Sequence, residues 1–142
     1  MKSILSCLIF ALVLAGCSST PSIRDSARLA LYKTHAGAPV SSIHYLGRFD
    51  SWEALGDDAV AIWTRPREAW LLELSGPCSG LQYSPIIALT SQFGEVHAGV
   101  DKVLVRDTGA INVPCWIRRI RPLDVGAIRQ AEQAARVPVG TY

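Results

Sequence analysis

The feature that most constrains the fold is a pair of short apolar runs within residues 59–74, separated by the polar connection 65–68. Two such runs around a short connection predict a β-hairpin. If Thr64 pairs with Ala69, both faces of the hairpin are largely apolar, and such a strand pair belongs inside a sandwich or small barrel. The facing pairs in this register are Trp63 with Trp70, Ala61 with Leu72, and Ile62 with Leu71.

More short apolar runs follow, with turn residues between them, at a spacing typical of an all-β core. Residues 51–56 are interpreted as a turn, and Pro122 is expected to end the last strand. The further strands are predicted at residues 43–49, 86–90, 96–100, 102–106 and 115–121.

Helical patterns lie on both sides of the strands. Ser22 and Asp25 form a weak capping box before a helix over 23–34, and Asp124 can cap a helix over 125–136. The apolar stripes are Ile23, Ala27, Ala30 and Leu31 in the first helix and Val125, Ile128, Ala131 and Ala135 in the second.

We therefore expect a mainly β (α+β) protein, a small antiparallel β sandwich or barrel flanked by an N-terminal and a C-terminal helix. The single globular domain is predicted over residues 23–136. Residues 137–142 are predicted to be a loose C-terminal tail.

The N-terminus has the layout of a secretory signal. Lys2 precedes an apolar run from Ile4 to Leu14, which is shorter than the ~20 residues of a spanning helix. The quartet Leu14-Ala15-Gly16-Cys17 resembles the lipobox of bacterial lipoproteins. That resemblance implies a signal peptide over 1–16, cleavage before Cys17, diacylglycerol on its thiol, and a lipidated tether over 17–22. An ordinary secretory signal, or an uncleaved anchor, is the alternative.

Position 18 bears on the destination. In the sorting of bacterial lipoproteins an aspartate at this position retains the protein in the inner membrane, and this chain has Ser18. The resemblance therefore implies lipid anchoring to the outer membrane, facing the periplasm. Two or more acyl chains give a stable anchor, whereas a single chain holds a protein only marginally.

The mature chain is small and nearly neutral. Removing residues 1–16 from the 142 leaves 126 residues, enough for one domain with a core. Lys2 is the only charged residue removed, so the formal charge falls from +2 to +1. This balance predicts no general attraction to nucleic acid, and any effect of charge must come from a local patch.

Two cysteines remain in the mature domain, Cys78 and Cys115. A lone pair in an oxidising compartment predicts a disulfide, which would close a loop of 38 residues and stabilise the fold by ~4 kcal/mol. The alternative is a metal site with His97 as a third ligand. The chain has no CxxC or HxxxH spacing, so the disulfide is favoured and neither a metal nor a cofactor is predicted.

Several segments recur together in a fixed order, and they resemble a family of short proteobacterial envelope lipoproteins that carries only a domain-of-unknown-function label. The resemblance spans roughly Ala36 to Asp124 and brings no known activity or ligand. What it implies is the lipid anchor and the paired cysteines. The segments are residues 52–57, 62–66, 71–74, 77–78, and Cys115 with 120–122.

The densest acidic cluster is Asp57 and Asp58, with Asp50 and Glu53 nearby. Paired carboxylates can perform acid–base catalysis or bind calcium, and a histidine beside them would suit a small hydrolase. Aspartates between a glycine and a strand more often satisfy turn amides, and the calcium-loop pattern is absent, so a turn is favoured. The candidate histidines are His35, His44 and His97.

A binding surface is predicted around one tryptophan. Trp63 and Trp70 are assigned to the core, whereas Trp52 and Trp116 could be exposed. Arginines near Trp116 could bind lipopolysaccharide phosphates or an acidic partner, or could instead protect a strand edge from association. The candidate binding residues are Trp116, Arg118, Arg119 and Arg121, with Arg65 and Arg67 from the hairpin connection.

The sequence favours a non-catalytic, lipid-anchored cell-envelope protein that acts as an interaction or binding module. Its partner would be an envelope protein, lipopolysaccharide or a cell-wall component, and no nucleic acid is expected. The alternative function is a small periplasmic hydrolase using Asp57 or Asp58 with a histidine. A purely structural protein without a discrete ligand is the third possibility.

Overall fold

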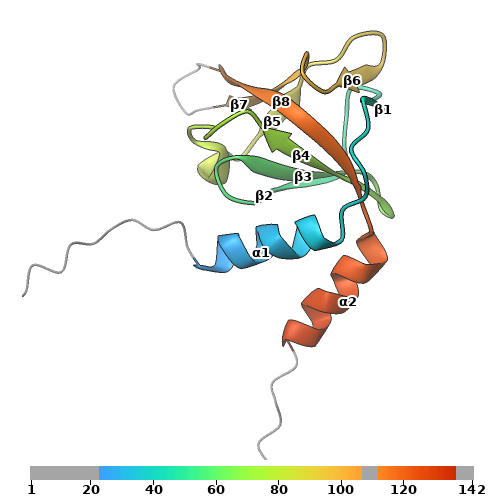
Figure 1. The fold of residues 1–142 in the computed structure, drawn as a ribbon. Helices are drawn as coiled ribbons and strands as arrows, with labels where there is room; N and C mark the ends of the chain where they lie inside the picture. The colour runs from blue at the N-terminus through green and yellow to red at the C-terminus, as the bar shows by residue number, and fades with distance from the viewer. Residues whose placement is uncertain (1–22, 107–111, 137–142) are drawn as a thin grey trace, which may run out of the picture.

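The computed structural model describes residues 23–106 and 112–136, which form a mostly β domain with one helix at each end (Figure 1). The predicted fold class is confirmed. The elements in chain order are α1 (Ile23–Thr34), β1 (Ser42–His44), β2 (Ser51–Ala54), β3 (Ala59–Arg65), β4 (Glu68–Leu74), the 3-10 helix η1 (Leu81–Tyr83), β5 (Ile87–Leu89), β6 (Glu95–His97), β7 (Lys102–Arg106), β8 (Asn112–Leu123) and α2 (Val125–Arg136).

Six strands form a curled antiparallel sheet in the order β2-β3-β4-β8-β7-β5, and β1 pairs with β6 in a second sheet (Figure 1). The long strand β8 connects the two halves of the larger sheet. Its C-terminal half pairs with β4, and its N-terminal half pairs with β7. An isolated bridge between Val40 and Ile120 places the segment before β1 against β8 as well.

The hairpin of β3 and β4 is apolar on both faces, as predicted. Val60 and Ile62 of β3 are buried in the core enclosed by the sheets, which also holds the two mature cysteines. Ala59 and Ala61 face the other way and pack in a second core that contains Tyr32 of α1 and Ile128 of α2. Because alanine side chains are short, the helices can approach this face of the sheet closely.

The C-terminal helix begins as predicted, since the backbone N–H of Ala127 donates to Oδ1 of Asp124 at 3.0 Å. The predicted cap Ser22 lies outside the described residues. The predicted apolar stripe of α1 is wrong in part, because Ala27 and Ala30 are exposed. The helix instead buries Tyr32, whose ring packs edge-on against Trp63 and covers more apolar area than an alanine can.

The predicted register of the hairpin is wrong by one residue. It holds only beside the turn, where Arg65 pairs with Glu68. A bulge at Thr64 then shifts the register, so that Trp63 pairs with Ala69 and Ile62 with Trp70. The Thr64 hydroxyl donates to the Glu68 carboxylate at 2.6 Å, which helps to hold the extra residue in place.

Two other local predictions are wrong. Residues 51–54 are strand β2 rather than a turn, because they pair with β3. Strand β8 continues through Pro122 to Leu123. The carbonyl of Pro122 accepts from Gly37 N–H at 2.8 Å, so its nitrogen also faces away from β4 and no hydrogen bond to β4 is lost.

Candidate functional site

The predicted centre of a binding surface, Trp116, lies on β8 and has 48% of its surface exposed. Lys102 is its neighbour on β7, and the Lys102 Nζ lies 4.1 Å from the centroid of the indole ring. This cation–π contact lies on one face of the ring and helps to hold it in place, while about half of the residue's surface stays exposed. Arg118 is exposed two residues further along β8 and makes no ion pair within the described part of the chain. We call Trp116, Lys102 and Arg118 the Trp116 surface.

Two of the predicted binding arginines have structural partners instead. The Arg119 Nη1 lies 3.3 Å from Oε2 of the buried Glu73. The guanidinium of Arg121 donates to the carbonyl oxygens of Gly37 at 2.8 Å and Ala36 at 3.0 Å. These contacts attach β8 to β4 and to the segment that follows α1.

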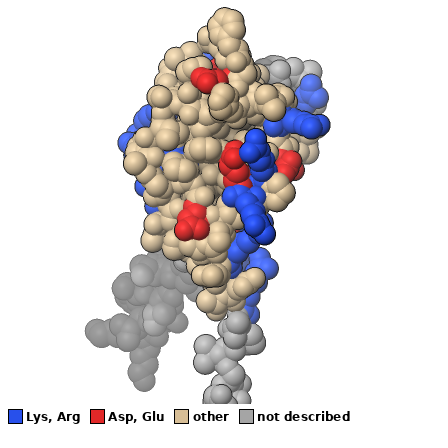
Figure 2. Space-filling model, turned by 90° about the vertical axis from the view of Figure 1, so that its right-hand side faces the viewer, with Lys and Arg blue, Asp and Glu red and all other residues tan. Residues whose placement is uncertain are grey.

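The two arginines of the hairpin connection do not join the Trp116 surface. Arg65 lies opposite Glu68 of β4. Arg119, which follows Trp116 and Arg118 on β8, lies opposite Glu73 of β4. Five residues of β4 separate these positions, or roughly 17 Å of strand. Arg67 lies at the hairpin tip beyond Arg65. Figure 2 shows basic side chains in a band along one side of the molecule, with acidic side chains among them, rather than a uniform basic patch.

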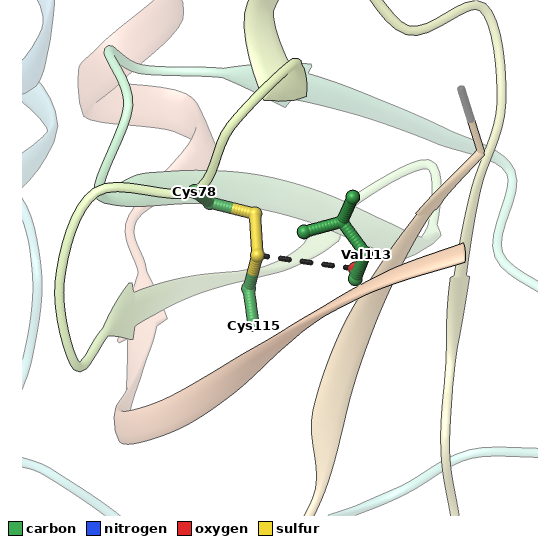
Figure 3. The surroundings of a disulfide bond; sticks show 3 residues. All are labelled: Cys78, Val113 and Cys115. Carbon is green, nitrogen blue, oxygen red and sulfur yellow. Dashed lines mark hydrogen bonds between the residues drawn. A yellow bond between two sulfur atoms is a disulfide. The ribbon is translucent and has the colours of Figure 1, made fainter. Parts of the chain in front are cut away.

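The predicted disulfide is present. Cys78 and Cys115 are bonded, with their Cα atoms 5.7 Å apart, and both residues are buried (Figure 3). The Cys115 sulfur also lies 4.0 Å from the carbonyl oxygen of Val113. The bond ties the loop after β4 to β8, immediately beside Trp116.

The acidic pair Asp57–Asp58 lies in the turn between β2 and β3. The backbone carbonyl of Asp57 accepts from Cys78 N–H at 2.7 Å, and that of Asp58 accepts from Leu74 N–H at 2.8 Å. Oδ1 of Asp57 accepts from the Gln82 side chain at 2.9 Å. A hollow of about 270 Å³ adjoins the turn, and no histidine lines it. Its lining residues are Asp25, Ser26, Leu29, Leu55, Gly56, Asp57, Asp58 and Pro77.

Two of the three histidines lie on the β1–β6 sheet and have other acidic partners. Nε2 of His97 is 3.3 Å from Glu95, and its Nδ1 is 3.5 Å from the buried Asp101. Nδ1 of His44 is 3.9 Å from Glu95. His35 follows the last residue of α1. Across residues 23–106 and 112–136, no three His, Cys, Asp or Glu side chains are placed to hold a metal ion.

A groove between α1 and α2 was not predicted from the sequence. It has a volume of about 280 Å³, and the two helices that line it lie at an angle to each other in Figure 1. We call it the interhelical groove. It is lined by Arg28 and Tyr32 of α1, Glu53 of β2, Trp63 of β3, and Val125, Ile128, Arg129, Glu132 and Arg136 of α2.

Charged and polar groups converge in this groove. The Arg28 guanidinium forms ion pairs with Glu53 and, at 3.3 Å, with Glu132. The Tyr32 hydroxyl lies 3.4 Å from each of the same two carboxylates. Arg129 donates to the carbonyl oxygen of Pro66 at 3.1 Å. The network therefore connects both helices to the sheet.

Burial and charge perturb two titratable groups in the groove. Burial raises the pKa of the Tyr32 phenol far above its ordinary value of 10.0, and the carboxylates of Glu53 and Glu132 raise it further. Burial opposes the charge of Arg28, but the same carboxylates outweigh it and raise the pKa of the guanidinium. A concave site with converging polar groups and perturbed pKa values is a candidate ligand site.

A model of a family of unknown function, DUF6491, matches residues 1–138. The chain belongs to the DUF6491 family. No curated protein matches it, and no solved structure matches it either. No helix in the described part of this DUF6491 protein has the length and apolar character needed to cross a membrane.

Sequence reasoning missed the groove in this DUF6491 protein because its residues are distant along the chain. Arg28 and Glu132 are separated by 104 residues, yet they form an ion pair. The sequence held one signal. Arg28 and Tyr32 are four residues apart and therefore lie on the same side of the first predicted helix, and the second predicted helix carries Glu132. That signal becomes informative only once the packing of the two helices is known.

Proposed function

We propose that this protein is a non-catalytic, lipid-anchored module of the cell envelope that binds an acidic protein partner through its Trp116 surface. The signal layout of residues 1–16 and the lipobox-like quartet ending at Cys17 support the anchor. Ser18 supports the outer membrane as the destination, and the resemblance to short proteobacterial envelope lipoproteins agrees with both.

The anchor would hold the domain close to the membrane. Helix α1 begins at Ile23, six residues after Cys17. Six residues span at most about 20 Å when fully extended. A protein so attached reaches partners that are themselves in or near the membrane.

The observation that carries the proposal is the exposed indole of Trp116. Large aromatic side chains are enriched at the centres of protein interfaces, where their burial contributes much of the binding energy. The Lys102 contact already fixes the ring, so little side-chain entropy remains to be lost on binding. Lys102 and Arg118 lack acidic partners in the described residues, which favours a partner of negative charge.

The alternative, a small hydrolase, has less support. It requires a histidine beside Asp57 or Asp58, and the hollow next to that turn is lined by none. His44 and His97 instead approach Glu95 and Asp101. Of these contacts, the one between His44 and Glu95 joins β1 to β6, and neither histidine lies against the Asp57–Asp58 turn.

In-cell photocrosslinking tests the proposal. A photoreactive phenylalanine analogue replaces Trp116 on β8, and in a matched control it replaces Phe93, an exposed aromatic residue of the turn before β6. We expect an adduct with one envelope protein at position 116 and none with that protein at position 93. Adducts at both positions, adducts with lipopolysaccharide alone, or no adduct at position 116 would contradict a protein partner at this surface.

A further inference from the structure

Two aromatic residues, Tyr32 and Trp63, form the base of the interhelical groove. The rings of Tyr32 and Trp63 meet edge to face, with centroids 6.3 Å apart and planes at 84°. Tyr32 is only 2% exposed, so its ring supports the indole of Trp63 from the core, while Trp63 itself is partly accessible. The volume of about 280 Å³ is at the lower limit of ligand sites, which are roughly 300–1,000 Å³. A ligand of one or two rings fits that size.

The rim of the groove carries charges of both signs. Arg28, Arg129 and Arg136 contribute three positive charges, and Glu53 and Glu132 contribute two negative charges. A phosphate or other strong anion would meet both carboxylates. A wholly apolar ligand would remove ionised groups from water without replacing their hydrogen bonds. The rim therefore favours a ligand that is polar, largely uncharged, and able both to donate and to accept hydrogen bonds.

The carboxylates have capacity to accept more hydrogen bonds. The Tyr32 hydroxyl has one proton, yet both Glu53 and Glu132 lie 3.4 Å from its oxygen. Only one of them can receive that proton at a time, and 3.4 Å is long for a bond between two oxygens. A ligand hydroxyl reaching either carboxylate would make a shorter, charge-assisted bond.

We propose that the interhelical groove binds a saccharide. A sugar ring presents an apolar face, which can pack on the indole of Trp63, and an edge of hydroxyl groups, which can donate to Glu53 or Glu132 and accept from the arginines. This inference does not depend on the Trp116 surface or on the lipid anchor. Envelope glycans and free sugars share this chemistry, so the experiment below separates the two sources.

The first arm of the test uses a soluble oligomer of N-acetylglucosamine, titrated into nitrogen-labelled protein and followed by NMR. Each of the four tryptophans gives its own indole N–H signal. We expect the signal of Trp63 to move and that of Trp116 to stay. Glu132→Gln should weaken binding about tenfold, because one charge-assisted hydrogen bond is lost. Glu95→Gln makes the same carboxylate-to-amide change on β6, at a residue that does not line the groove, so it is the matched control and should bind normally.

The second arm measures co-sedimentation of the protein with insoluble cell-wall sacculi. Co-sedimentation that the soluble oligomer competes away, and that Glu132→Gln reduces, assigns the ligand to wall glycan. Binding of the soluble oligomer alone assigns it to a free saccharide, and the proposal holds. No movement of the Trp63 signal, or co-sedimentation unaffected by Glu132→Gln, overturns it. Because Glu132→Gln keeps the shape of the side chain, the dispersion of its NMR spectrum shows whether the variant is folded.

Discussion

The carboxylate of Glu73, on β4, is held between two cations beneath helix α1. Its Oε2 lies 3.3 Å from Arg119 Nη1, and its Oε1 lies 3.8 Å from Lys33 Nζ. Glu73 is only 4% exposed, and its Oε2 makes no hydrogen bond within the described residues. The charge on this buried oxygen is therefore balanced by ion pairing alone, which makes the fold sensitive to the loss of Arg119.

We expect Arg119→Ala to lower the free energy of unfolding by about 2 kcal/mol. Removing one partner of a buried pair costs roughly 3–5 kcal/mol, and Lys33 would still compensate part of the Glu73 charge. Chemical denaturation measures the loss. Arg118→Ala is the matched control and should change stability by less than about 0.5 kcal/mol. Equal effects of the two variants would show that the ion pair with Glu73 contributes nothing.

Loss of the disulfide is expected to destabilise the domain by about 4 kcal/mol. Without the bond the unfolded chain no longer contains a closed loop of 38 residues, so its conformational entropy is higher. The double variant Cys78→Ala/Cys115→Ala, compared with the parent by thermal unfolding, gives the measurement. Adding a reductant should destabilise the parent and leave the double variant unchanged. A melting temperature that is the same with and without the bond would contradict this prediction.

Stability should fall at alkaline pH because of Tyr32. Its pKa in the folded protein is raised above the ordinary 10.0, so above that pH the unfolded chain releases the phenolic proton while the folded chain keeps it. The folded state then binds more protons, and the free energy of unfolding falls by up to about 1.4 kcal/mol per pH unit. Below pH 10 the phenol keeps its proton in both the folded and the unfolded state, so the free energy of unfolding is not reduced by Tyr32.

Urea denaturation between about pH 9 and 11 tests this dependence. Tyr32→Phe should flatten the alkaline fall relative to the parent protein. Tyr83→Phe, which alters a phenol that is 88% exposed, is the control and should leave the slope as it is. Burial also raises the pKa of Tyr45, so part of the fall remains in Tyr32→Phe. An unaltered slope in that variant would refute the role assigned to Tyr32.

The elements that the sequence predicts well are those set by local signals. Both helices have the predicted bounds, 23–34 and 125–136, and the strand over 102–106 matches β7. Asp124 caps α2 because the cap depends only on residues within one helical turn. The hairpin has apolar side chains on both faces, so the sequence also predicts that other elements pack against each face, without indicating which elements these are.

The elements that it predicts poorly depend on contacts distant in sequence. Residues 51–54 have little strand character of their own and become β2 by pairing with β3. Pro122 is tolerated within β8 because its nitrogen faces Gly37, a contact invisible in the local sequence. The interhelical groove joins Arg28 to Glu132 across the whole domain. Such sites follow from packing and cannot be deduced from spacing.

The last prediction concerns the proposed lipid anchor at Cys17. Cys17→Ala removes the thiol that would carry diacylglycerol, so the protein should lose incorporated radiolabelled fatty acid and move from the membrane fraction to the soluble envelope fraction. Cys7→Ala is the matched control, because it also removes a thiol near the N-terminus but lies inside the predicted signal peptide. That variant should keep its label and remain in the membrane fraction. If Cys17→Ala keeps both the incorporated fatty acid and its place in the membrane fraction, Cys17 does not carry the lipid and the prediction is wrong.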